Sequence, residues 1–236
     1  GLYIYFSEGI RFATFRVYSF ACCSLVIEAV KNNESVLFAT IIFLFGGIIG
    51  TFHHLYFSGT PTAILALGAT FSALEVVPLT LMGFEIRENW NLLKSKAWMQ
   101  KYKWPIFFFI AVAFWNFVGA GVFGFLINPP IALYYIQGLN TTAVHAHTAL
   151  FGVYGMLGMG FILICLRFYS DRNWENTKLN RAFWCLNIGL VAMVLFSLLP
   201  IGIIQAYTSI TKGYSFARDA ELLYSPTVQL LKWLRM

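Results

Sequence analysis

The stretch IFFFIAVAFWNFVGAGVFGFLI, residues 106–127, decides the class of fold. It contains no Asp, Glu, Lys, Arg or His. The hydrocarbon core of a bilayer is about 30 Å thick, and a helix needs about 20 apolar residues to cross it. Residues 106–127 are therefore predicted to form a transmembrane helix.

The whole chain has the composition of an integral membrane protein. Of its 236 residues, 59% are hydrophobic, 18% are aromatic and only 11% are charged, and the mean hydropathy is +0.70. A soluble domain carries about 25% charged residues. This composition excludes an ordinary soluble protein and implies a lipid bilayer as the surrounding medium.

Windows of about 20 apolar residues predict an all-α fold, a polytopic transmembrane bundle with about six membrane-spanning helices. The expected spans are 3–30, 36–58, 62–84, 106–127, 143–168 and 182–206. The first span is interrupted by charged residues, so it is expected to face protein or to be partly misplaced. These interruptions are Glu8, Arg11, Arg16 and Glu28.

The formal net charge of +6 does not indicate a nucleic-acid partner, because the basic residues lie in short connections between apolar spans. By the positive-inside rule, the connections after the third and fifth spans are predicted to be cytoplasmic. Their basic residues are Arg87, Lys94, Lys96, Lys101, Lys103, Arg172, Lys178 and Arg181. Residues 59–61 and 128–142 contain no Lys or Arg and are predicted to lie on the opposite side.

The chain has four histidines, in two tight pairs: His53 with His54, and His145 with His147. The first pair precedes the outer end of the second span, and the second pair opens the fifth span from that same side. All four are predicted to lie at similar depth. Imidazole is costly to bury in lipid without a partner, so two such pairs favour metal ligation.

The spacing within each pair limits its geometry. His145 and His147 are about 200° apart around a helix, so they point to opposite flanks and each can serve a different flat cofactor. His53 and His54 are about 100° apart, and a loosened helix end before Gly59 and Pro61 would let both rings reach one ion. Two imidazoles suit iron, copper or zinc, and a third ligand would be needed.

Glu75 lies in the middle of the third span, where a lone carboxylate is expensive. It is predicted to be protonated, metal-bound or part of a proton path. The alternative for Glu75 and the histidines is that all five are hydrogen-bonded polar residues of a helix bundle. A non-redox membrane transporter would fit that alternative.

Four stretches resemble the catalytic subunit of bacterial nitric oxide reductases, members of the haem-copper oxidase superfamily. They are residues 50–54 with 59–61, residues 71–75, residues 119–125 and residues 145–152, reading GTFHH with GTP, FSALE, GAGVFGF and HAHTALFG. They occur in family order, and the resemblance covers about residues 36–236. Residues 216–221 and the run to Arg235 are more similar to the quinol-dependent type.

The resemblance implies a role for each candidate residue. His53 and His54 would bind a non-haem iron, and His145 would be the axial ligand of a high-spin haem b facing that iron. His147 would be an axial ligand of a second, low-spin haem b. Glu75 would be the catalytic carboxylate beside the iron, supplying protons.

One position departs from the family pattern. The family has a third iron-binding histidine four residues before a Glu-Gly pair, but Ile4 stands at that place before Glu8. Glu8 is a further candidate near the iron, for the family's second carboxylate. We expect residues 1–236 to be a carboxy-terminal fragment, part of a transmembrane catalytic domain whose missing amino-terminal part supplies the second low-spin haem ligand.

The expected function is reduction of nitric oxide to nitrous oxide with electrons from quinol, in the bacterial inner (cytoplasmic) membrane. A nitric oxide dismutase with a modified iron site, built on the same scaffold, is one alternative. An oxygen-reducing haem-copper oxidase is another.

Overall fold

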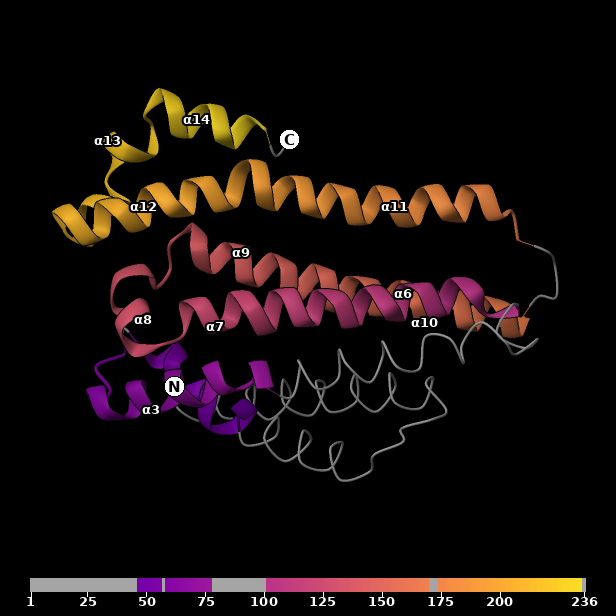
Figure 1. Ribbon diagram of the computed structural model, residues 1–236, viewed down its shortest axis with the longest axis horizontal. Helices are drawn as coiled ribbons and strands as arrows, with labels where there is room; N and C mark the ends of the chain where they lie inside the picture. The colour runs from indigo at the N-terminus through magenta and orange to yellow at the C-terminus, as the bar shows by residue number, and fades with distance from the viewer. Residues whose placement is uncertain (1–45, 57, 78–100, 170–173, 235–236) are drawn as a thin grey trace.

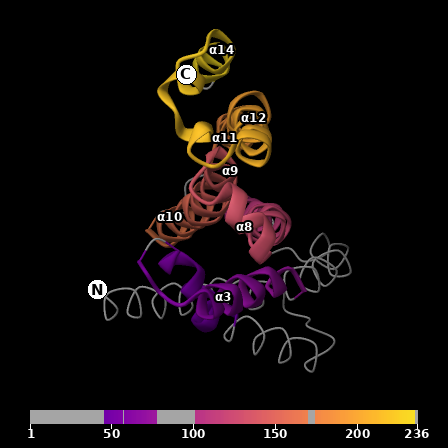
Figure 2. The same ribbon diagram turned by 90° about the vertical axis from the view of Figure 1, so that its left-hand side faces the viewer.

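The computed structural model describes residues 46–56, 58–77, 101–169 and 174–234. Within these ranges all regular secondary structure is helical, which confirms the all-α prediction. Three helices are long and apolar enough to cross a membrane: 103–127, 140–169 and 176–212. They lie alongside one another as antiparallel rods (Figures 1 and 2).

Each long helix is built from three consecutive segments. Residues 103–127 comprise α6 (Lys103–Trp115), the π-helix η2 (Asn116–Phe123) and α7 (Gly124–Ile127). Residues 140–169 comprise α9 (Asn140–Ala149), the π-helix η3 (Leu150–Gly155) and α10 (Met156–Tyr169). Residues 176–212 comprise α11 (Asn176–Met193), the π-helix η4 (Val194–Leu198) and α12 (Leu199–Lys212).

The three long helices contain the predicted spans 106–127, 143–168 and 182–206. All three helices extend beyond those limits, because the polar residues at their ends are helical although they fail an apolar window. The six predicted spans are thus confirmed only in part. The first span lies outside the described residues, the second is described only from residue 46, and the third only to residue 77.

The chain before the long helices forms a short hairpin. Residues 46–50 are helical and continue into the 3₁₀-helix η1 (Thr51–Leu55). A turn with Gly59 at φ 76° leads into α3 (Thr62–Leu74), which packs against η1. The histidine pair thus lies in a 3₁₀-helix, which is wound more tightly than an α-helix, and not in a loosened helix end.

The π-helical segments have local causes in the sequence. Glycines at 119, 121, 152 and 155 lie within η2 and η3, where the absence of a Cβ eases a widened turn. Near η4 the cause is Pro200, which has no N–H to donate to the carbonyl of Phe196. A pattern based on 3.6 residues per turn does not predict these segments.

Aromatic side chains of α6 pack against glycines of the 140–169 helix. A Cβ on Gly152 would lie 2.6 Å from Trp115 Cβ, and one on Gly160 would lie 2.7 Å from Phe109 Cε1. The Trp115 indole donates from Nε1 to Asn187 Oδ1 at 2.8 Å, which links α6 to α11. All three long helices therefore meet around Trp115.

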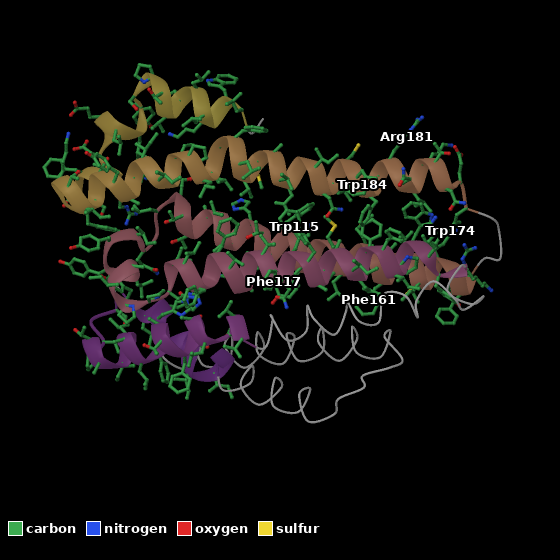
Figure 3. All side chains as sticks on the ribbon, in the orientation of Figure 1. Trp115, Phe117, Phe161, Trp174, Arg181 and Trp184 are labelled. Carbon is green, nitrogen blue, oxygen red and sulfur yellow. The ribbon has the colours of Figure 1, made fainter. Side chains whose placement is uncertain are left out.

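The two ends of the bundle are formed by different parts of the chain. Trp174 and Arg181 lie at one end (Figure 3), where Arg167 Nε donates to the Lys101 carbonyl at 3.1 Å and its guanidinium stacks 3.9 Å from the Trp174 ring centroid. At the other end lie α3, the start of α9, the end of α12 and α8 (Pro130–Ile136) (Figure 1). Lys101 and Arg181, two of the basic residues predicted to be cytoplasmic, thus lie at the same end of the bundle.

The chain after α12 folds back on the bundle. Gly213 has φ 110° and ends α12. After η5 (Phe216–Arg218) and α13 (Ala220–Leu223), helix α14 (Pro226–Trp233) runs back along the long helix and packs on η4 (Figure 1).

Candidate functional site

The second histidine pair lies on α9, and its two rings leave the helix on different sides. His145 is half-buried, and its Nδ1 lies 2.7 Å from the carbonyl oxygen of Gly119 in η2. His147 is exposed, and its Nδ1 lies 2.8 Å from the Ala143 carbonyl one turn earlier in α9. This arrangement agrees with the angular separation of about 200° derived from the sequence.

Both bonds fix the imidazole tautomer. A carbonyl oxygen only accepts hydrogen bonds, so Nδ1 is the donor in each ring, and in a neutral imidazole the lone pair is then on Nε2. Histidines that bind metals characteristically donate their other ring N–H to a carbonyl or carboxylate in this way. The donor chemistry of His145 and His147 therefore fits axial ligation of haem iron through Nε2.

Two glycines of the 103–127 helix shape the surroundings of His145. A Cβ on Gly124 would lie 3.3 Å from His145 Cε1 and 3.4 Å from its Nδ1. Gly119 supplies the carbonyl that anchors the ring, and a Cβ there would lie 2.7 Å from Ala149 N. The structure thus places two glycines of the stretch 119–125 beside the imidazole of His145.

The first histidine pair lies in η1, and its two rings stack on each other. Their centroids are 4.1 Å apart and their planes are tilted by 35°. Helix α3 packs closely against this turn, because a Cβ on Gly68 would lie 2.7 Å from His53 N.

The ring separation is compatible with binding of one ion by both histidines. If each nitrogen were about 2.1 Å from an ion, as in zinc sites, each centroid would be roughly 3.2 Å from it and the centroids would subtend about 80°. Within the described ranges no group of three or more His, Cys, Asp or Glu side chains is placed to hold a metal ion. Among the described residues the two imidazoles are thus at most part of a metal site, and Glu8 lies outside these residues.

Glu75 ends α3 and is buried, with 3% of its surface exposed. Its side chain lies against the backbone of residue 46, where a Cβ would come 2.8 Å from Glu75 Cγ. One turn earlier on α3, Ser72 Oγ accepts a hydrogen bond from Asn128 Nδ2 at 2.9 Å. Sequence reasoning missed Asn128, which stood out only as a polar residue between an apolar span and Pro129.

The elements that carry these residues lie at one end of the bundle. Figure 1 shows η1, α3 and the start of α9 together at that end, and Figure 2 views the bundle from it. Helix α7, which carries Gly124 beside the His145 ring, packs on α3.

Comparison with known proteins identifies the family. Residues 10–236 match the family described as Cytochrome C and Quinol oxidase polypeptide I. The chain belongs to this family. Haem and metal cofactors and a membrane location follow at the level of the family.

A relative of the chain carries a more specific name. Over 169 residues the chain is 32% identical to a nitric oxide reductase subunit of Stutzerimonas stutzeri, and the match covers 70% of this chain. The chain spans only about a third of that relative, since the match covers 35% of the relative's length. The predicted resemblance to nitric oxide reductases of the haem-copper oxidase superfamily is confirmed.

Proposed function

We propose that this chain is part of a membrane-bound nitric oxide reductase of the bacterial cytoplasmic membrane. The reaction joins two molecules of nitric oxide with two electrons and two protons to give one nitrous oxide and one water. The observation that carries the proposal is the pair of imidazoles on α9, on different sides of one helix and each with Nδ1 bonded to a carbonyl. The similarity to the nitric oxide reductase of Stutzerimonas stutzeri supports it.

In this proposal His145 holds a high-spin haem b and His147 a low-spin haem b, each through Nε2. The Gly119 carbonyl keeps the His145 ring in one orientation and makes Nε2 a stronger ligand. The Ala143 carbonyl does the same for His147. Because one helix carries both ligands, electrons need to cross only the width of α9.

His53 and His54 are the proposed ligands of the non-haem iron beside the high-spin haem. When bound, haem and iron supply electrons and bring the two substrate molecules together, which removes much of the entropy cost of their encounter. Glu75 is proposed to deliver protons and to balance charge near the iron. Its burial supports this role, because a carboxyl group is costly to bury at membrane depth and is rarely found there without a function.

Quinol is the proposed electron donor, on the basis of residues 216–221 and the run to residue 235. The full-length protein should oxidise a soluble quinol analogue with nitric oxide as acceptor. Turnover with reduced cytochrome c, but not with the quinol, would show that the donor assignment is wrong.

The function is tested with Glu75→Gln in the full-length protein. We expect both haems to remain bound, with unchanged visible absorption, while nitric oxide turnover falls strongly because the titratable proton is gone. The matched control is Glu175→Gln. Glu175 is exposed at the start of α11, where its carboxylate pairs with Lys178 of the next turn at 2.7 Å. Near-normal turnover in Glu75→Gln would remove the proposed role.

The second candidate function is oxygen reduction with copper beside the haem, and the family description, which names oxidases, favours it. A nitric oxide dismutase is a further candidate, because Ile4 stands where the reductase pattern has histidine. Metal analysis of the purified protein distinguishes the oxidase from the reductase, since copper would support the oxidase. Oxygen evolution from nitric oxide without added donor would support the dismutase.

A further inference from the structure

Helix α7 lies between the two halves of the proposed centre. One half consists of η1 and α3, which carry His53, His54 and Glu75, and the other is α9, which carries His145. Gly124 and Asn128 are four residues apart at the two ends of α7, and residues with this spacing lie on one face of a helix. Gly124 faces the His145 ring, because a Cβ on it would lie 3.3 Å from His145 Cε1, whereas Asn128 is hydrogen-bonded to Ser72 of α3.

Asn128 is bonded in two directions. Its side chain donates from Nδ2 to Ser72 Oγ at 2.9 Å, and its backbone N–H donates to the Gly124 carbonyl at 3.0 Å. Only 3% of its surface is exposed, so water cannot easily replace either bond. A single residue thereby connects the turn beside His145 with α3.

Ser72 passes this connection on to the histidine turn. Gly50, which directly precedes η1, lies so close to α3 that a Cβ on it would be 3.2 Å from both Cα and Cβ of Ser72. Ser72 is also one turn before Glu75 on α3. A shift of Ser72 relative to α7 would therefore move the histidine turn and the carboxylate relative to His145.

We infer that Asn128 is a positioning residue that sets the spacing between the non-haem iron at His53 and His54 and the haem at His145. This inference rests on the proposed function. Two substrate molecules must meet between the metals, and a misplacement of about 1 Å can cost about 100-fold in rate. The Asn128–Ser72 hydrogen bond would act by holding α3 at a fixed distance from α7.

The test uses Asn128→Leu, which keeps the approximate size of the side chain but removes the donor, and Ser72→Ala, which removes the acceptor. Both are made in the full-length protein and combined in a double variant. The readouts are haem and iron content, nitric oxide turnover, and the electron paramagnetic resonance of the oxidised protein. Two ferric ions held close together couple magnetically, so a wider spacing should uncover a high-spin ferric haem signal.

We expect each single variant to retain both haems, to gain the high-spin signal and to lose about 10- to 100-fold in turnover. The double variant should be no worse than the more severe single variant, because both changes remove the same bond. Asn187→Leu is the matched control. It also loses a side-chain bond between helices, to Trp115, but far along the chain from α3 and α7, and it should show no new signal.

A high-spin signal unchanged from the unmodified protein in both Asn128→Leu and Ser72→Ala would overturn the inference. A gain of the high-spin signal in Asn187→Leu would also overturn the inference, because the effect would then reflect general loosening of the bundle. If the unmodified protein contains no haem and no iron, the proposed function itself is wrong.

Discussion

Gln205 provides the sharpest test of how the haem-ligand helix is held. Its Oε1 accepts hydrogen bonds from the backbone N–H of Asn140 at 2.9 Å and from Asn140 Nδ2 at 2.8 Å. Its Nε2 donates to the Ala217 carbonyl at 2.9 Å. Because Asn140 begins α9, Gln205 satisfies one of the N–H groups that have no partner within the helix.

Replacing Gln205 by Leu removes all three bonds and keeps a side chain of similar size. Gln205 is 4% exposed and Ala217 is fully buried, whereas Asn140 is half-buried and can regain water. Leaving the buried Ala217 carbonyl unpaired should cost about 1–3 kcal/mol, and losing the two bonds to Asn140 should cost about 0.5–1.5 kcal/mol each, so the expected loss is about 2–6 kcal/mol of unfolding free energy. In a chain of about 150–250 residues that corresponds to a drop in melting temperature on the order of 10 °C, and the drop becomes smaller as chain length increases.

The assay is thermal unfolding of the detergent-solubilised full-length protein, followed by circular dichroism. The matched control is Gln229→Leu, since Gln229 makes one local bond to the Leu223 carbonyl at 2.9 Å and should cost about 1 kcal/mol. A Gln205→Leu shift no larger than that of Gln229→Leu would refute the reasoning.

Three further outcomes follow from contacts within the bundle. Asn187→Leu leaves the buried Trp115 indole N–H unpaired and should destabilise the protein by about 1–3 kcal/mol in thermal unfolding, with unchanged visible absorption. Gly152→Ala places a Cβ 2.6 Å from Trp115 Cβ and should cost about 1–3 kcal/mol, whereas Gly158→Ala, with nothing within 4 Å, should be neutral or slightly stabilising; equal melting temperatures would contradict this. Under the proposed function, His147→Ala should remove one of two haems, and retention of both in a pyridine haemochrome assay would exclude His147 as a ligand.

Local sequence was enough to predict the helices and the directions of the α9 histidines. The three long helices follow from uninterrupted apolar residues, and the different sides taken by His145 and His147 follow from helix geometry alone. Both properties depend on residues close together in the chain. The 3₁₀-helix at His53 and His54 was not predicted, because the sequence indicated a loosened helix end before Gly59 and Pro61.

Contacts between distant segments could not be predicted. Asn128 and Ser72 are 56 residues apart, and Asn140 and Gln205 are 65 residues apart. A single polar residue in an apolar run does not identify its partner, because any neighbouring helix could supply one. The bounds of the π-helical segments were also missed, since they depend on packing as well as on glycine and proline.

The position of both ligand histidines on α9 has a consequence for how the proposed centre would respond to strain. Two residues of one helix are joined by covalent bonds and rise only about 3 Å along its axis, so bending or sliding of the bundle leaves their separation nearly constant. The histidine turn of η1 is joined to α9 through side-chain contacts between separate helices. Changes in lateral membrane pressure would therefore alter the substrate gap well before they altered the path between the two haems.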